Sequence, residues 1–346
     1  MSDIPEQIKK PVYIRKVSAK KPKVKYSYFH ENNGKVGGKI NDNKTIRKLS
    51  DIKVPHSYTN VQLYPHPTNK LQATGFDGNS QKQYFYSEKH REDSEKEKYC
   101  TLISFYKVLP KIMSKISSLL GKSRIDLETM HAIALKVMLI CNFRIGNEEN
   151  LKKYDTYGLS TITTKEVKIN SSKTNATIKF VGKKQQVNEC TITDKNLVGF
   201  LSRLVDYHRK SCDCKAGQHT LFKYSSGQVT GQSLNEFLQK YDEDISTKTL
   251  RTWFANVKFI ESMNKHSGLT KAGAGSQTEK NKIVKEIIDQ GAKDLHHTSS
   301  IHKKSYLHPA LPSLFMDNTS SWMSLKKKHK TPEGFLMDIL HKECKK

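Results

Sequence analysis

A run of apolar residues from position 126 to 143, DLETMHAIALKVMLICNF, constrains the fold of this chain more than any other segment. Its residues have helical spacing, and the apolar side chains cover nearly the whole circumference of the helix that they predict. Such a helix is stable only when other elements surround it. We therefore predict that this segment is the buried centre of a helical domain.

Further segments of helical spacing lie at 102–121, 196–210, 233–242, 249–263 and 281–291. Thr331, as an N-cap, and Pro332, at the first helical position, predict one more helix near the C-terminus. Strand-like segments at 166–172, 176–184 and 186–193 lie among the helices. Residues 99–346 are thus predicted to form a mainly α-helical domain that carries one small antiparallel sheet.

The first hundred residues have a different pattern, with short β-like segments separated by turn signals such as Asn33-Gly34 and Gly37-Gly38. A charged run at 87–100, with alternating signs, follows them and is either a solvated helix or a linker. We predict an α+β protein in which a small β-rich domain, residues 1–98, precedes the larger helical domain.

The charge of the chain narrows the choice of partners. The sequence has 60 Lys and Arg against 34 Asp and Glu, a formal net charge of +26. Such an excess favours a polyanion as partner, most commonly a nucleic acid. Neither an apolar run of about 18 residues nor an apolar N-terminal stretch is present, so we expect no membrane span and no secretory signal. The expectation is a soluble, intracellular protein.

The cysteines show no regular spacing, and Cys141 lies inside the apolar run, so we expect reduced thiols and a reducing compartment. One group has some likeness to a metal site: Cys212 and Cys214, flanked by His208 and His219. Its C-x-C spacing departs from the usual C-x-x-C of zinc sites. A polar loop is the preferred interpretation, and we predict neither a metal nor a cofactor.

Two arginines stand where packing alone would favour an apolar residue. Arg144 follows the most apolar helix, and Arg251 lies between Leu250 and Trp253. Each either pairs with a buried carboxylate or directs its planar donors at an anionic ligand such as a phosphate. Taken one at a time, such arginines are more often structural.

Three further residues complete a set that can act on a phosphodiester. Lys183 follows a strand and a glycine, and an ammonium at a hairpin tip can act as a general acid, although such lysines are usually only solvated. His297 or its neighbour His296 can donate to a phosphate oxygen. A phenol in water has a pKa of roughly 10, so attack by Tyr306 on phosphorus requires surrounding positive charge. Lys303, Lys304 and the arginines can supply that charge.

With these residues in place, the chain resembles the type IB DNA topoisomerases of the poxvirus and bacterial kind, including those of other large DNA viruses. The resemblance rests on RIGNEENLKKYDTYGLSTI, FVGKKQQV, KTLRTWFAN and HHTSSIHKKSY. It implies that Tyr306 is the nucleophile, that Lys183 is the general acid, and that Arg144, Arg251 and His297 stabilise the transition state. Alignment on the tyrosine selects His297 over His296.

The N-terminal segment LYPHPTNKLQATGFDGNSQKQYFYSEKHRE is similar to the same family. The resemblance implies that Gln83, Tyr84 and Tyr86 contact DNA, and Lys248, Lys303 and Lys304 are expected to do so too. Tyr84 and Tyr86 alternate along a strand and therefore face the same side. Taken alone, they would indicate a half-buried tyrosine strand. GNSQKQY is less basic than the corresponding segment of many relatives, which bears on the preferred cleavage sequence.

The implied mechanism is transient cleavage of one strand of duplex DNA through a 3′-phosphotyrosyl bond, swivelling of the free 5′ end, and religation without ATP or a metal. The two domains are expected to clamp the DNA. We expect a monomer that needs neither a protein partner nor a membrane. If the chain is viral, we expect it in the virion or at a cytoplasmic replication site rather than in the nucleus.

Two alternatives remain. Tyrosine site-specific recombinases share nearly the same catalytic residues, but they generally carry His-x-x-Arg where this chain has Lys248-Thr-Leu-Arg251, and their N-terminal domain is helical. A non-enzymatic, basic DNA-packaging protein would explain the charge equally well. It does not explain one tyrosine at a fixed spacing after a histidine.

Overall fold

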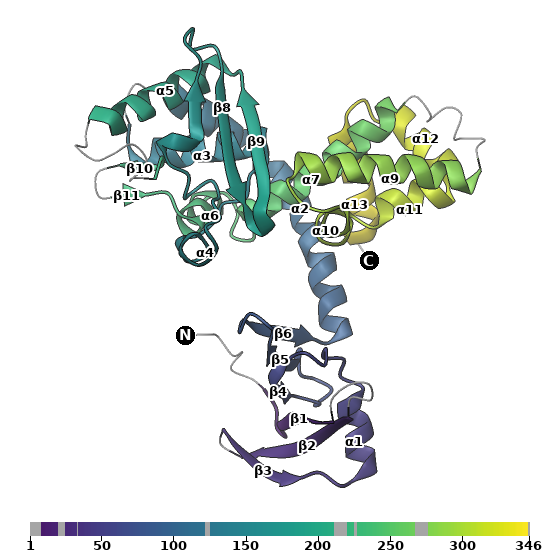
Figure 1. Cartoon of the computed structure of the whole chain (residues 1–346). Coiled ribbons are helices and arrows are strands. Elements are labelled where there is room, and N and C mark those ends of the chain that lie inside the picture. Colours follow the sequence, from purple (N-terminus) through teal and green to yellow (C-terminus); the bar gives the residue numbers. More distant parts are fainter. Residues whose placement is uncertain are drawn as a thin grey trace. The chain divides into compact units, whose positions relative to one another are not determined.

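The computed structural model of the chain describes residues 8–19, 25–32, 34–121, 125–210, 220–224, 227–266 and 276–344. The chain divides into two compact units, Met1–Glu97 and Lys98–Lys346. Figure 1 shows the strands of the first unit and the mixture of helices and strands in the second. The predicted α+β class is confirmed.

The N-terminal unit is built on a six-stranded antiparallel sheet in the order β3-β2-β1-β4-β5-β6. One helix, α1 (Asn43–Ser50), contributes Leu49 to the core of this unit. Arg15 is buried there, and its guanidinium donates to the carbonyl oxygens of Val54 and Pro55. The strands are β1 (Tyr13–Ala19), β2 (Lys25–Asn32), β3 (Lys35–Lys39), β4 (Thr59–Leu63), β5 (Leu71–Phe76) and β6 (Lys82–Tyr86).

The charged run at 87–100 is helical, which decides between the two predicted alternatives. It forms the first part of α2 (Glu88–Leu120), whose buried residues begin at Tyr99. The second part of α2 turns apolar side chains such as Leu102, Phe105 and Ile112 into the core of the C-terminal unit. One helix thus changes from a solvated to a buried element along its length.

The apolar run is α3 (Leu127–Cys141), and ten of its residues are buried, as predicted. Asp126 caps its first turn by accepting from the backbone N–H of Thr129 at 2.8 Å. The helix ends at Asn142, whose φ of 54° lies in the left-handed region. The helix lies against β9 and α6, and Figure 1 shows it beside the small sheet.

The predicted small sheet is present, with the antiparallel order β7-β8-β9. Its strands are β7 (Val167–Ile169), β8 (Ala176–Gly182) and β9 (Gln186–Ile192), and a short pair is formed by β10 (Lys223–Tyr224) and β11 (Gly227–Gln228). Thr331 caps the last helix by accepting from the backbone N–H of Gly334, as predicted. The other α-helices of the described residues are α4 (Glu148–Tyr154), α5 (Lys195–Lys210), α6 (Gly231–Gln239), α7 (Thr247–Lys265), α9 (Gln277–Asp294), α10 (Ser299–Ser305), α11 (Ala310–Asp317), α12 (Thr319–Lys328) and α13 (Pro332–Cys344).

The prediction of reduced thiols is wrong for four cysteines. Cys100 is bonded to Cys344, and Cys141 to Cys190. The partners are 244 and 49 positions apart in sequence, but folding brings their Cα atoms to 5.7 and 5.5 Å, within the range of disulfides. The spacing of cysteines along the sequence cannot reveal such pairs. The expectation of a reducing compartment rested on that spacing, so it loses its support.

The candidate metal group is only partly described. Cys212, Cys214 and His219 lie outside the described residues, and Nε2 of His208 lies 2.8 Å from the carbonyl oxygen of Leu221. The absence of a metal there stays a prediction. Within the described ranges, no helix combines the length and the apolar character needed to cross a membrane.

Candidate active site

Tyr306 stands at the end of α10, a short helix that begins at the N-cap Thr298. Its backbone N–H donates to the carbonyl oxygen of His302 at 3.1 Å, and its side chain lines a cavity of ≈ 260 Å³. None of the described lining residues is Asp or Glu, so the cavity suits an anion. They are Arg144, Lys183, Lys184, Gln186, Lys248, His296, His297, Thr298, Ile301, Ser305 and Tyr306.

All five predicted catalytic residues come together at this cavity. Four of them line it, and the guanidinium carbon of the fifth, Arg251, lies over the ring of Tyr306, 5.3 Å from its centre. They come from the segment after α3, the β8–β9 turn, α7 and the α9–α10 region. Only the fold brings them together, because 162 positions separate the first of these residues from the last.

Arg144 is held by a close approach of two backbone segments. Gly146 has a φ of +81°, and a Cβ added there would lie 2.7 Å from Cα of Gly158. This contact lets the backbone N–H of Leu159 donate to the carbonyl oxygen of Arg144 at 2.8 Å. The Nη1 group of Arg144 in turn donates to the carbonyl oxygen of His296 at 2.7 Å. The two glycines therefore explain why RIGN and YGL occur together in this sequence.

Arg251 has no carboxylate partner among the described residues. It is 5% exposed, and Nη2 donates to the carbonyl oxygen of Leu295 at 2.8 Å, while Nε and Nη1 are buried without a partner. Burial lowers the pKa of Arg251 to about 10, with a smaller opposing effect of Tyr306, so the guanidinium stays charged at neutral pH. Unpaired donors on a buried cation favour the anionic-ligand alternative over the structural one.

The structure also separates the two candidate histidines. The ring of His297 stacks on that of Tyr306, with centroids 4.8 Å apart. His296 has a φ of 53°, packs against Phe143, and places Nε2 3.0 Å from the carbonyl oxygen of Cys141. Burial, with added repulsion from Arg251, lowers the pKa of His297 to about 3, so its ring is neutral at neutral pH. His297 is therefore the histidine that contacts the tyrosine.

Lys183 stands just after Gly182, where the β8–β9 hairpin turns. A Cβ at Gly182 would lie 2.4 Å from Nδ2 of Asn188, so only glycine allows the side chain of Asn188 to lie there. The next residue, Lys184, has a φ of 62° and reverses the chain. The hairpin presents Lys183 at the cavity as an exposed side chain, unlike the buried arginine.

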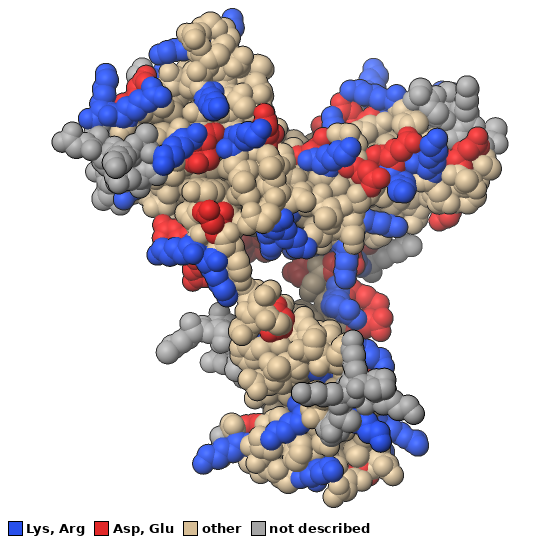
Figure 2. Space-filling view, in the orientation of Figure 1, with Lys and Arg blue, Asp and Glu red and all other residues tan. Residues whose placement is uncertain are grey.

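The other predicted DNA contacts divide into three groups. Lys248 lines the cavity, whereas Lys303 and Lys304 are exposed on α10 and do not line it. Tyr84 and Tyr86 of β6 line a separate hollow of ≈ 630 Å³ in the N-terminal unit, and Phe85 between them lines it too, so their common face stays a prediction. Gln83 of the same strand donates to Asp77 at 2.8 Å. Figure 2 shows lysine and arginine side chains spread over the surface of each unit.

Sequence reasoning missed the residues that hold the main chain of Tyr306. The buried side chain of Asn256 donates to the carbonyl oxygen of Tyr306 at 2.9 Å and accepts from the backbone N–H of His308 at 2.7 Å. The hydroxyl of Tyr99 donates to the carbonyl oxygen of Leu307 at 2.6 Å. The available signal was an asparagine five positions after Arg251 in the predicted helix at 249–263.

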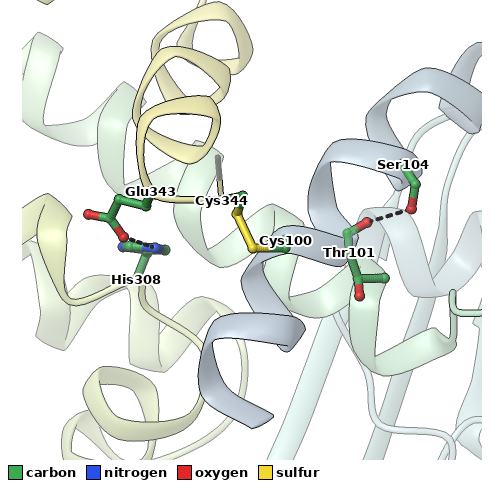
Figure 3. The surroundings of a disulfide bond; sticks show 6 residues. All are labelled: Cys100, Thr101, Ser104, His308, Glu343 and Cys344. Carbon is green, nitrogen blue, oxygen red and sulfur yellow. Dashed lines mark hydrogen bonds and ion pairs between the residues drawn. A yellow bond between two sulfur atoms is a disulfide. The ribbon is translucent and has the colours of Figure 1, made fainter. Parts of the chain in front are cut away.

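A second support comes from α13 (Figure 3). Burial lowers the pKa of His308 to about 4, so its ring is neutral at neutral pH. Its Nδ1 accepts from the backbone N–H of Ala310, which leaves Nε2 to donate to Glu343 at 3.1 Å. The next residue, Cys344, is bonded to Cys100 of α2. The segment after Tyr306 is thus fixed to α2, α7 and α13.

Comparison with known proteins identifies the family. Residues 87–331 match the family model described as "Eukaryotic DNA topoisomerase I, catalytic core". The chain belongs to the DNA topoisomerase I family. The matched range contains all five predicted catalytic residues of this topoisomerase, whereas Gln83, Tyr84 and Tyr86 precede it.

Named relatives of this topoisomerase come from viruses. The DNA topoisomerase 1B of Acanthamoeba polyphaga mimivirus is 26% identical over 326 residues, which cover 90% of each chain. The DNA topoisomerase 1B of Vaccinia virus (strain Copenhagen) is 25% identical over 280 residues, covering 80% of this chain and 83% of the relative. The predicted type IB family and enzyme class are confirmed.

A solved structure of XerH site-specific recombinase, bound to palindromic difH substrate in a post-cleavage complex, has a TM-score of 0.36 and 13% identity. The match covers 61% of this chain and 51% of the recombinase, so the topoisomerase spans about half of that protein. No conclusion about this chain rests on so low a TM-score. The family match favours the topoisomerase over the recombinase alternative.

Proposed function

We propose that this type IB topoisomerase relaxes supercoiled duplex DNA by using Tyr306 as its nucleophile. The phenol releases its proton to solvent water as the Oη–phosphorus bond forms, and the bond from phosphorus to the 5′ oxygen breaks. A 3′-phosphotyrosyl bond and a free 5′ hydroxyl result, and the reverse reaction religates the strand. The observation that carries this proposal is the position of Tyr306 beside a buried arginine that has two unpaired donors.

The cations around Tyr306 match the charge that this reaction develops. Arg251 is desolvated yet charged at neutral pH, so its field on the phenolate and on the phosphate oxygens is little weakened by water. Arg144 donates to the carbonyl oxygen of His296, the residue next to the one that accepts from Arg251. The neutral ring of His297 can donate a hydrogen bond to a non-bridging oxygen, which becomes more negative in the transition state.

Lys183 is proposed as the acid that protonates the departing 5′ oxygen. Its exposed position at the hairpin tip supports this role, because the leaving oxygen belongs to the DNA rather than to the protein core. The bond that breaks and the bond that forms are both phosphodiesters, so religation needs no ATP. Side-chain donors alone can stabilise the charge, and we propose that no metal takes part.

Duplex DNA is the proposed partner of both units. Support comes from the net charge of +26 and from the anion-suited cavity. The hollow of the N-terminal unit adds Tyr84, Tyr86 and three cations, Lys48, Lys53 and Arg91, beside two carboxylates, Asp51 and Glu88. We propose contacts from Gln83, Lys248, Lys303 and Lys304 as well, and a monomer as the active form. The viral relatives support work in a virion or at a viral replication site.

The direct test is Tyr306→Phe, assayed for relaxation of a supercoiled plasmid and for a covalent protein–DNA adduct. We expect DNA binding to persist and both activities to disappear. Tyr241→Phe, which removes the hydroxyl of a partly buried tyrosine elsewhere in the same unit, is the matched control and should be active. Relaxation by Tyr306→Phe would contradict the proposal. Relaxation by the wild-type protein that requires paired DNA sites would favour a recombinase.

The role of Lys183 has its own test. Lys183→Ala should cleave ordinary DNA slowly, but it should cleave a substrate with sulfur in place of the bridging 5′ oxygen at nearly the wild-type rate, because a thiolate leaves without protonation. Lys179→Ala, on strand β8 of the same hairpin and outside the cavity, is the control. Equal defects of Lys183→Ala on both substrates would exclude the general-acid role.

A further inference from the structure

His302 is a buried titratable side chain to which the proposed mechanism gives no role. It is 1% exposed on α10, and its Nδ1 lies 3.0 Å from Nε2 of His297. Its other ring nitrogen is held close to α9, because a Cβ on Gly291 would lie 2.8 Å from Nε2 of His302. A buried imidazole costs free energy unless it is hydrogen-bonded, so the bond to His297 is the reason that this position can hold histidine.

The second nitrogen of His297 is left for a ligand. Nδ1 is buried and has no partner among the described residues. It belongs to the ring that stacks on Tyr306 and that lines the anion-suited cavity. An orphaned polar atom at a functional site needs a partner in the working complex, and here the partner that fits is an oxygen of the scissile phosphate.

The two rings share one proton between the facing nitrogens. Burial lowers the pKa of His297 to about 3 and that of His302 to about 4, so both rings are neutral at neutral pH and each carries a single N–H. If Nε2 of His297 donates, its Nδ1 is bare and repels an anion. If Nε2 of His297 instead accepts a hydrogen bond from His302, the single N–H of His297 is at Nδ1 and can donate to an anion.

We propose that His302 is a positioning residue for His297. Its Nδ1–H donates to Nε2 of His297, fixes the ring, and keeps the proton of His297 on Nδ1, from which it reaches a non-bridging phosphate oxygen. This inference rests on the proposed function, because it assigns a partner to one of the transition-state donors.

The test compares two substitutions at position 302 in single-turnover cleavage with saturating enzyme. His302→Asn keeps an N–H donor near the position of Nδ1, whereas His302→Leu removes it at similar size. We expect His302→Leu to lower the cleavage rate constant by about 10- to 100-fold, the cost of weakening one transition-state donor. DNA affinity should be unchanged, and His302→Asn should stay within about threefold of wild type.

A double-mutant comparison separates positioning from packing. In a His297→Asn background, His302→Leu should cause little further loss, because the group that it positions is already absent. A full additional loss, equal defects of the Asn and Leu variants, or wild-type rates for both would overturn the proposal. Relaxation by Tyr306→Phe would instead overturn the proposed function, so the two failures are distinguishable.

A spectroscopic measurement decides the tautomer without activity and applies even if His302→Leu does not fold. In the wild-type protein labelled with ¹⁵N-histidine, the ring shifts of His297, assigned by their loss in His297→Asn, should show a protonated Nδ1 and an unprotonated Nε2 at neutral pH. The opposite tautomer would make His302 the acceptor and would refute the proposal.

Discussion

At the scale of single residues, Asn256 fixes the backbone on both sides of Leu307 through its two bonds to Tyr306 and His308. Asn256→Ala should leave these buried groups unpaired, which costs about 1–3 kcal/mol of stability. It should also slow single-turnover cleavage at least about tenfold, because small displacements of a nucleophile have large effects. Quench-flow measurement of adduct formation checks this prediction.

Asn264→Ala is the matched control, because it changes the same residue type on the same helix, α7. Asn264 accepts from the indole N–H of Trp322 at 3.1 Å, away from the cavity. This variant should lose stability and keep its cleavage rate constant. Equal cleavage rates in the two variants would show that the main chain of Tyr306 does not depend on Asn256.

The chemistry of single residues could be predicted further than their surroundings. The anionic-ligand alternative for Arg251 was open from the sequence, but only the fold shows the missing carboxylate and the two unpaired donors. His297 could be chosen over His296 by resemblance, and the left-handed backbone of His296 supplies a physical reason. Asn256 and His302 had no visible role, because their partners are fixed by helix packing rather than by sequence spacing.

At the scale of helices and strands, the two disulfides join α2 to α13 and α3 to β9. They close loops of different length, with separations of 244 and 49 positions. Each disulfide should add about 2–4 kcal/mol to the free energy of unfolding. Because loop entropy grows with loop length, removal of Cys100–Cys344 should cost roughly 1.4 kcal/mol more than removal of Cys141–Cys190. Denaturant unfolding of Cys100→Ser/Cys344→Ser and Cys141→Ser/Cys190→Ser measures both.

Reduction by dithiothreitol supplies the control for the disulfide prediction. Reduced wild-type protein should be less stable than either double variant, since it lacks both bonds. Each double variant should lose less on reduction than the wild type does. Equal stability of oxidised and reduced wild-type protein would contradict a structural role for these bonds.

The elements themselves were predictable where periodicity was strong. The apolar helix α3, the β8–β9 hairpin and the start of α13 at Pro332 all follow local signals. Helix α1 was missed because it is eight residues long and buries only Leu49, too little for a periodic pattern. The disulfides were missed because they depend on contacts between distant elements.

At the scale of the whole molecule, three buried histidines should make stability sensitive to mild acid. Burial lowers the pKa values of His297, His302 and His308 to about 3, 4 and 4, against roughly 6.5 when unfolded. Below pH 6.5 the unfolded chain binds protons that the folded chain does not. The free energy of unfolding should therefore fall between about pH 6.5 and 4.

Urea unfolding across this pH range, followed by fluorescence, measures that fall. Both tryptophans, Trp253 and Trp322, are buried in the C-terminal unit, so the signal reports the unit that holds these histidines. His308→Gln should flatten the pH dependence, since it removes one of the titrating groups. The hydrogen bond with Lys328 is the main cause that lowers the pKa of Asp338 from its ordinary value of 3.8. Protonation of Asp338 therefore changes the free energy of unfolding only below about pH 4, outside the range of the histidines. A pH-independent stability would contradict the prediction.

The net charge of +26 should make DNA binding and DNA cleavage respond differently to salt. Binding by Tyr306→Phe, which cannot turn over, should weaken by roughly 10³- to 10⁵-fold between 50 and 200 mM salt if 6–10 phosphates are contacted, because counterions must be displaced. The cleavage rate constant at saturating wild-type enzyme should change little, since Arg251 is buried and poorly screened by ions. Filter binding measures the DNA affinity, and single-turnover cleavage at the same salt concentrations measures the cleavage rate constant. A cleavage rate constant that falls in parallel with affinity would mean that exposed lysines, rather than the buried arginine, stabilise the transition state.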